Sequence, residues 1–124
     1  MLSSGVAVTP KRARELALAL ENVSEAPHFD RVAFRTPRRI FATLARSGND
    51  LNFMFDHALQ AHFCAVAPEA IAPVPGGWGR MGATRCDLKK VAAATFTAAL
   101  KAAHARASVP RPKASKRAKR LGAG

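Results

Sequence analysis

The feature that most constrains the fold is an alternation of apolar side chains between residues 29 and 56. Apolar residues recur at every second position in two runs, at Ile40, Ala42 and Leu44 and at Leu51, Phe53 and Phe55. A period of two predicts strands with one buried face. A third strand is expected near residues 32–34. The connections at residues 36–39 and 47–50 are short and rich in turn-forming residues, so the three strands should be antiparallel neighbours.

Helical patterns flank these strands on both sides. Thr9 is a suitable N-cap in front of a proline, and apolar residues then recur at helical spacing, which predicts a helix over about residues 10–21. A longer helix should begin near Asp87 and end near Ala107, because Pro110 cannot continue it.

The middle of the chain alternates between element types. Asp56 can cap a short helix that Pro68 ends before residue 70. Residues 72–82 hold too many prolines and glycines for a helix, so we expect an extended segment, a tight turn and a strand over residues 83–86. The chain should therefore form a single α+β domain with an antiparallel sheet of about four to five strands.

The positive charge is unevenly distributed along the chain. The net charge is +12, yet residues 1–105 carry 13 basic and 8 acidic side chains, whereas residues 106–124 carry 7 basic and no acidic ones. We divide the chain into a flexible N-terminus (1–8), a folded domain (9–107) and a disordered basic tail (108–124), because the tail lacks apolar residues to bury. Such an excess predicts an anionic partner.

Cysteine content and hydropathy indicate an intracellular setting. The two cysteines, Cys64 and Cys86, are too few for the disulfide framework of small secreted domains, and buried free thiols are expected. No apolar run approaches the roughly 20 residues that cross a bilayer, and the first residues lack a signal-peptide pattern. We therefore expect a cytoplasmic protein without a membrane span.

The histidines give little support for catalysis or metal binding. No two of the four histidines have the i, i+4 spacing of a helical metal site. His62 and Cys64 lie two residues apart on a predicted helix and hence on different faces, which makes a weak metal site. Neither a P-loop nor a nucleophile elbow is present. The sequence predicts a non-enzymatic protein without a cofactor.

Two segments taken together resemble the MmcQ/YjbR family. They are Pro27-His-Phe-Asp-Arg-Val-Ala-Phe-Arg-Thr-Pro-Arg-Arg-Ile-Phe-Ala-Thr-Leu44 and Pro73-Val-Pro-Gly-Gly-Trp-Gly-Arg-Met-Gly-Ala-Thr-Arg-Cys-Asp-Leu88. The resemblance spans about residues 10–107 and implies a CyaY-like fold, in which the N-terminal and C-terminal helices pack on one face of a twisted antiparallel sheet. It also implies double-wing DNA binding. Family members usually carry an aromatic residue where this chain has Ala83.

By position, the two wings are hairpins around residues 35–39 and 78–85. Guanidinium groups at exposed turns can bind phosphate oxygens in a bidentate manner, although charged hairpin tips are also ordinary solvated loops. We expect Trp78 to pack in the core or against its hairpin rather than to stack on a base. The candidate phosphate-contacting residues of the wings are Arg35, Arg38, Arg39, Arg80 and Arg85.

The basic tail should add affinity that falls steeply with salt and carries no sequence information. Its candidate residues are Lys113, Lys116, Arg117, Lys119 and Arg120. The tail also fits RNA, an anionic membrane surface or a solubilising role. The sequence thus favours a monomeric nucleic-acid-binding protein with DNA as its partner and RNA as the second choice. A protein-interaction module with an acidic partner and a small-molecule enzyme remain the alternatives.

Overall fold

The computed structural model describes residues 8–110, and the rest of the chain lies outside the described part. The predictions for a flexible segment before residue 8 and for Lys113, Lys116, Arg117, Lys119 and Arg120 of the tail fall outside it. The elements in chain order are α1 (Pro10–Leu18), β1 (Ser24–His28), β2 (Arg31–Arg35), β3 (Ile40–Ala45), β4 (Asp50–Met54), α2 (His57–Val66), β5 (Ile71–Pro73), α3 (Gly77–Arg80), β6 (Ala83–Asp87) and α4 (Ala93–Ser108).

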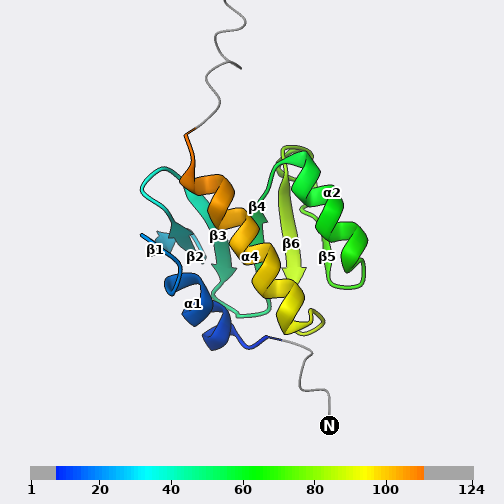
Figure 1. Cartoon of the computed structure of the whole chain (residues 1–124). Coiled ribbons are helices and arrows are strands. Elements are labelled where there is room, and N and C mark those ends of the chain that lie inside the picture. Colours follow the sequence, from blue (N-terminus) through cyan, green and yellow to red (C-terminus); the bar gives the residue numbers. More distant parts are fainter. Residues whose placement is uncertain (1–7, 111–124) are drawn as a thin grey trace, which may run out of the picture.

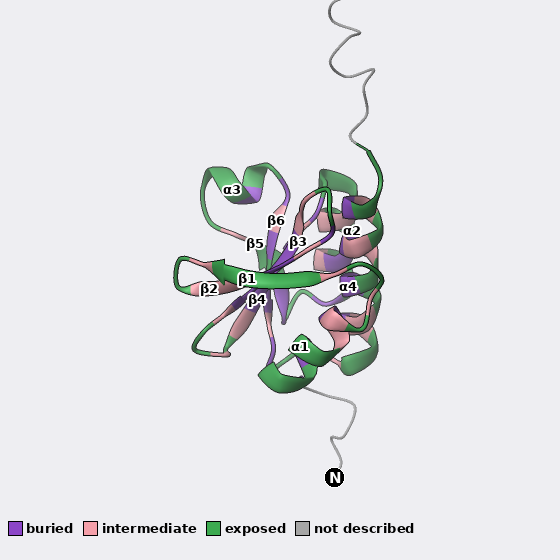
Figure 2. Cartoon of the chain, turned by 90° about the vertical axis from the view of Figure 1, so that its left-hand side faces the viewer, coloured by how far each residue is buried: buried purple, intermediate pink, exposed green. Residues whose placement is uncertain are grey.

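The strands form one antiparallel sheet in the order β1-β2-β3-β4-β6-β5. Helices α1, α2 and α4 lie on one face of it, and the short helix α3 lies toward the other side (Figures 1 and 2). The predicted α+β class with an antiparallel sheet is confirmed. The strand count was wrong, because the sheet has six strands rather than four to five. The two edge strands account for the difference, since neither shows the alternation of a half-buried strand.

Register sorts the side chains of the sheet onto two faces. Paired positions such as Phe34 with Ala42, and Leu51 with Cys86, point to the helices and are buried. Their neighbours point to the uncovered face, where Thr43 pairs with Asn52. The register shifts between Phe34 and Arg35. This bulge in the β2–β3 ladder accompanies the burial of consecutive residues at the start of β3.

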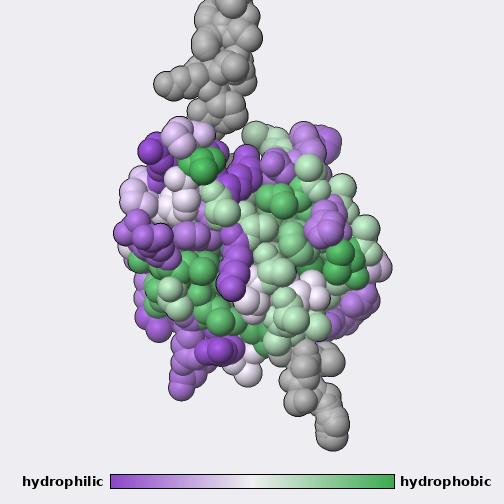
Figure 3. All heavy atoms as spheres, viewed as in Figure 1, coloured by the Kyte–Doolittle hydropathy of each residue, from purple (hydrophilic) through white to green (hydrophobic). Residues whose placement is uncertain are grey.

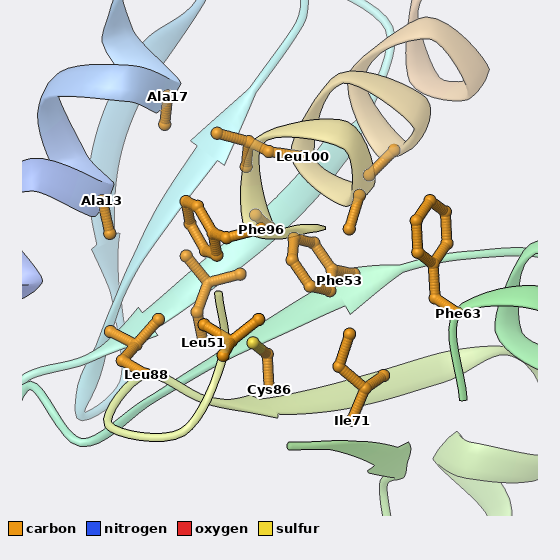
Figure 4. Close-up of a cluster of buried hydrophobic side chains, with 14 of the residues drawn as sticks. Ala13, Ala17, Leu51, Phe53, Phe63, Ile71, Cys86, Leu88, Phe96 and Leu100 are labelled. Carbon is orange, nitrogen blue, oxygen red and sulfur yellow. The ribbon is translucent and has the colours of Figure 1, made fainter. Parts of the chain in front are cut away.

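The core is built mainly from phenylalanine and small side chains. The Phe53 ring lies 5.8 Å from that of Phe96, so the centre of the sheet meets α4 directly (Figure 4). Helix α1 contributes Ala13 and Ala17 as its buried residues (Figure 4), and such small side chains allow a helix to pack closely on the sheet. Phenylalanine rings therefore supply much of the buried apolar area that large aliphatic side chains supply in other cores.

Several element boundaries differ from those predicted. Val8, assigned by sequence to the flexible N-terminus, is buried, and its N–H donates to the Leu88 carbonyl at 2.8 Å. Helix α1 ends at Leu18 rather than near residue 21. Helix α4 begins at Ala93 rather than near Asp87, because Asp87 first accepts backbone bonds that close a turn.

Candidate nucleic-acid interface

The β2–β3 loop, residues 36–39, is fixed to the C-terminal end of α4 by one threonine. Thr36 is only 2% exposed. Its hydroxyl donates to the Ala107 carbonyl at 2.9 Å and accepts from the N–H groups of Arg38 at 3.1 Å and Arg39 at 3.2 Å. A buried hydroxyl that satisfies three backbone groups holds the loop in one conformation. The position of the loop arginines is therefore set by the packing of α4.

The two arginines of this loop and Arg35 at the end of β2 have different roles. Arg35 Nε donates to the Thr36 carbonyl at 3.2 Å, and Arg39 Nη2 donates to the Val109 carbonyl at 3.0 Å, just beyond α4. Arg38 is exposed and lines a surface hollow together with Asn22 and Ser108. Two of the arginines thus hold backbone near the end of α4, and Arg38 is the one directed to solvent beside a polar depression.

Replacing Thr36 by valine should lower the free energy of unfolding by about 1–2 kcal/mol, because it leaves a buried carbonyl and two N–H groups without the hydroxyl. Chemical denaturation followed by circular dichroism measures this loss. Thr97→Val is the matched control, because the Thr97 hydroxyl bonds at 2.9 Å to Ala93 of its own helix in an exposed position. Equal losses for the two variants would contradict a special role for Thr36.

The second predicted wing contains the helix α3 and is shaped by glycines. A Cβ at Gly79 would lie 1.7 Å from the Val74 carbonyl oxygen, and one at Gly82 would lie 2.0 Å from that of Phe55. Two side chains of α2 brace the same turn: Gln60 donates to the Gly79 and Ala83 carbonyls at 2.8 and 3.2 Å, and His57 bonds the Arg80 carbonyl. The turn is therefore held on two sides.

The prediction that Trp78 packs in the core or against its hairpin was wrong. Its side chain is 72% exposed, and that of Met81 is 73% exposed. The physical reason is the close backbone approach at Gly79, which places the glycine side of α3 against the protein and directs Trp78 outward. The sequence carried a signal for this geometry in the glycines themselves, since close backbone contact requires them.

Arg80 and Arg85, predicted to act together, lie in different environments. Arg80 is exposed on α3. Arg85 lies within β6 on the uncovered face, where its Nη2 is 3.3 Å from an oxygen of Asp50. The other oxygen of Asp50 accepts from Arg31 at 2.9 Å, and Arg31 also bonds the hydroxyl and carbonyl of Thr43. Arg85 is thus part of an Arg-Asp-Arg network rather than of the wing tip.

The remaining four wing arginines lie at one end of the sheet. The β2–β3 loop and the segment between β5 and β6 follow strand ends that point the same way, at the upper end in Figures 1 and 2. They occupy two corners of this end, because the loop touches α4 while α3 lies toward the uncovered side (Figure 2). Hydrophilic residues lie around the margin of the helix-covered face, at the upper end but also at the left and lower left, beside the more hydrophobic surface of α2 and α4 (Figure 3).

Arg106, which the sequence analysis assigned to neither wing, also lies at this end of the sheet. Its guanidinium donates to the Met54 carbonyl at 3.4 Å and lies 3.9 Å from the Asp56 carboxylate. The Asp56 carboxylate therefore also lies at this end, where it is paired with Arg106. We use the name basic end for residues 35–39 with Arg80 and Arg106.

Other reactive groups are engaged or inert. Burial, together with the charges of Asp87 and Asp50, raises the pKa of Cys86 to about 12, so its thiol stays protonated at neutral pH. Cys64 is only partly buried, and neither cysteine forms a disulfide. Within residues 8–110, no three His, Cys, Asp or Glu side chains are grouped so that they could hold a metal ion. Across the same residues, no helix has both the length and the hydrophobicity to span a membrane.

Comparisons with known proteins returned no relative. No family model matches the chain, and neither the curated proteins nor the solved structures contain a match. The similarity to the MmcQ/YjbR family stays a prediction from residues 27–44 and 73–88.

Proposed function

We propose that this protein binds the phosphate backbone of nucleic acid with its basic end and acts without catalysing a reaction. The observation that carries the proposal is that two arginine-bearing segments far apart in the sequence lie at the same end of the sheet. Backbone contacts of this kind position a protein on nucleic acid without reading its sequence.

The charge available at the basic end supports this proposal. Among the described residues, no carboxylate lies within ion-pair distance of Arg35, Arg38 or Arg80. Unpaired guanidinium groups on fixed loops can bind phosphate in a bidentate manner at little conformational cost. Arg38 is the best placed, because it lies beside a hollow lined by the side chains of Asn22 and Ser108.

The basic C-terminal segment adds non-specific affinity in this proposal. Arg39 bonds Val109, so the chain leaves the described part next to the β2–β3 loop. Arg106 is paired with Asp56, but the six basic residues among positions 111–124 can each displace a counterion from nucleic acid. DNA is the favoured partner because of the family resemblance, and RNA is the alternative.

A charge-matched comparison in the full chain tests the proposal. The double variant Arg38→Ala/Arg80→Ala should bind a DNA duplex about 10-fold more weakly and lower the log-log salt slope by about 2, as expected for two lost phosphate contacts. The control is Arg46→Ala/Lys89→Ala, which removes the same charge from the opposite end of the sheet, where exposed residues follow β3 and β6. Fluorescence anisotropy across a salt series gives both quantities.

The control variant should retain its affinity within about twofold if the basic end is the binding surface. Equal losses for the two double variants would show that only total charge matters and would overturn the proposal. An RNA duplex of the same sequence, titrated in parallel, should bind more weakly than DNA. Tighter binding to the RNA duplex would indicate that RNA, rather than DNA, is the partner.

A further inference from the structure

Trp78 on α3 and Met81 directly after it are exposed apolar side chains, and the turn that carries them is held by several close contacts. Both side chains are more than two-thirds exposed. Beneath them, Gly79 and Gly82 approach backbone carbonyls too closely to admit a side chain, and Gln60 bonds two carbonyls of the same turn. Large apolar side chains on a fixed backbone are typical of a binding surface, because little entropy is lost when they are covered.

The chemistry around these side chains favours an aromatic ligand that is also anionic. The next residue after Gly79 is Arg80, which is exposed and lacks an ion-pair partner among the described residues. A nucleobase attached to a phosphate suits these two exposed residues, because the base can stack on the indole while the phosphate pairs with the guanidinium two residues further along α3. A purely apolar partner would leave the guanidinium desolvated at its margin.

We infer that Trp78 stacks on an unpaired base, so that the preferred ligand is single-stranded nucleic acid or the frayed part of a duplex. This inference rests on the proposed backbone contact at the basic end, and it adds base recognition without sequence reading. Bases within a duplex are already stacked on both faces, and opening such a stack is costly. An unpaired base has a free face for the indole, and any base suffices because each has a π-face.

The test uses the full chain and two probes of equal phosphate number, a single-stranded thymidine oligonucleotide and an abasic oligonucleotide of the same length. Trp78 is the only tryptophan and the chain has no tyrosine, so tryptophan emission reports this side chain alone. The thymidine probe should quench the emission, and the abasic probe should not. For the variants, affinity is measured by fluorescence anisotropy of labelled probes. Trp78→Ala should bind the thymidine probe about 10-fold more weakly and the abasic probe with unchanged affinity, whereas Trp78→Phe should retain most of the affinity for the thymidine probe.

Phe29→Ala is the matched control, because Phe29 is 91% exposed but lies next to β1, at the opposite sheet edge from β5 and β6. It should leave the affinity for both probes unchanged. Equal binding of the two probes, with no effect of Trp78→Ala, would overturn the stacking inference and leave the backbone contact standing. Failure of both probes to bind, while the DNA duplex still binds, would overturn the stacking inference alone, and failure of the duplex as well would overturn the proposed function. Unchanged unfolding midpoints for Trp78→Ala would separate a binding loss from a folding defect.

Discussion

Gly82→Ala should lower the free energy of unfolding by about 3–5 kcal/mol, a large loss for the addition of one methyl group. Two causes act together. Gly82 has φ +115°, which an alanine adopts only under strain, and its Cβ would lie 2.0 Å from the Phe55 carbonyl oxygen. Both obstacles are backbone, so neither can be relieved by a side-chain rotation. Urea denaturation followed by far-ultraviolet circular dichroism measures the loss.

Gly76→Ala separates the two causes. Gly76 also has a positive φ, +82°, but a Cβ there would have no atom within 4 Å. Its loss should therefore reflect backbone strain alone, about 1–2 kcal/mol. If Gly82→Ala cost no more than Gly76→Ala, the close contact with Phe55 would be absent, and the fixed presentation of Trp78 would lose one of its supports.

The parts of the fold that sequence reasoning recovered are those with one buried face. The sequence of β3 and β4 alternates because Leu44 and Leu51 lie on the buried, helix-covered face while their neighbours face the uncovered side. The N-terminus of α1 was also predicted correctly, since the Thr9 side chain caps it by accepting a hydrogen bond from the Arg12 N–H at 3.0 Å. At these positions the local residue preferences and the burial in the fold favour the same structure, so the sequence pattern alone was sufficient to predict it.

The edge strands were difficult to predict because neither shows alternating buried and exposed residues. All residues of β1 are exposed or half-buried, and Pro27 within it would exclude a central strand. β5 is only three residues long, with Ile71 as its buried residue. Such segments become strands through pairing with β2 and β6, which no local pattern in the sequence reports.

For the candidate site, the sequence indicated which arginines to consider but not which groups they bond in the folded protein. The cluster at residues 35–39 was visible as a basic turn, whereas its attachment to Ala107 joins positions 71 residues apart. Arg85 was assigned to the second wing by its position in the segment 78–85. The strand register instead places it beside Asn52, within reach of Asp50. Long-range pairing therefore decides which arginines are available for a ligand.

Asp50→Asn should lower the free energy of unfolding by about 2–3 kcal/mol. Asp50 and Arg31 have side chains only 16% and 20% exposed, and the carboxylate lies between Arg31 and Arg85. The neutral amide leaves Arg31 partly buried without an opposite charge. Removing the charge also relieves repulsion from Asp87, which pairs with Asp50 across β4 and β6, so we place the expected loss below that of a fully buried pair. Thermal and urea denaturation measure it.

Glu25→Gln is the matched control, because the Arg14–Glu25 pair has a shorter distance, 2.7 Å, but more exposed side chains. Solvent screens such a pair, so its loss should be clearly smaller than that of Asp50→Asn. Equal losses would mean that burial does not strengthen the Asp50 network. The same Asp50 variant also tests Arg85 as a ligand contact: releasing a 56% exposed guanidinium from its carboxylate should raise affinity for a DNA duplex if Arg85 contacts phosphate. Unchanged affinity would limit Arg85 to a structural role and leave binding to the basic end.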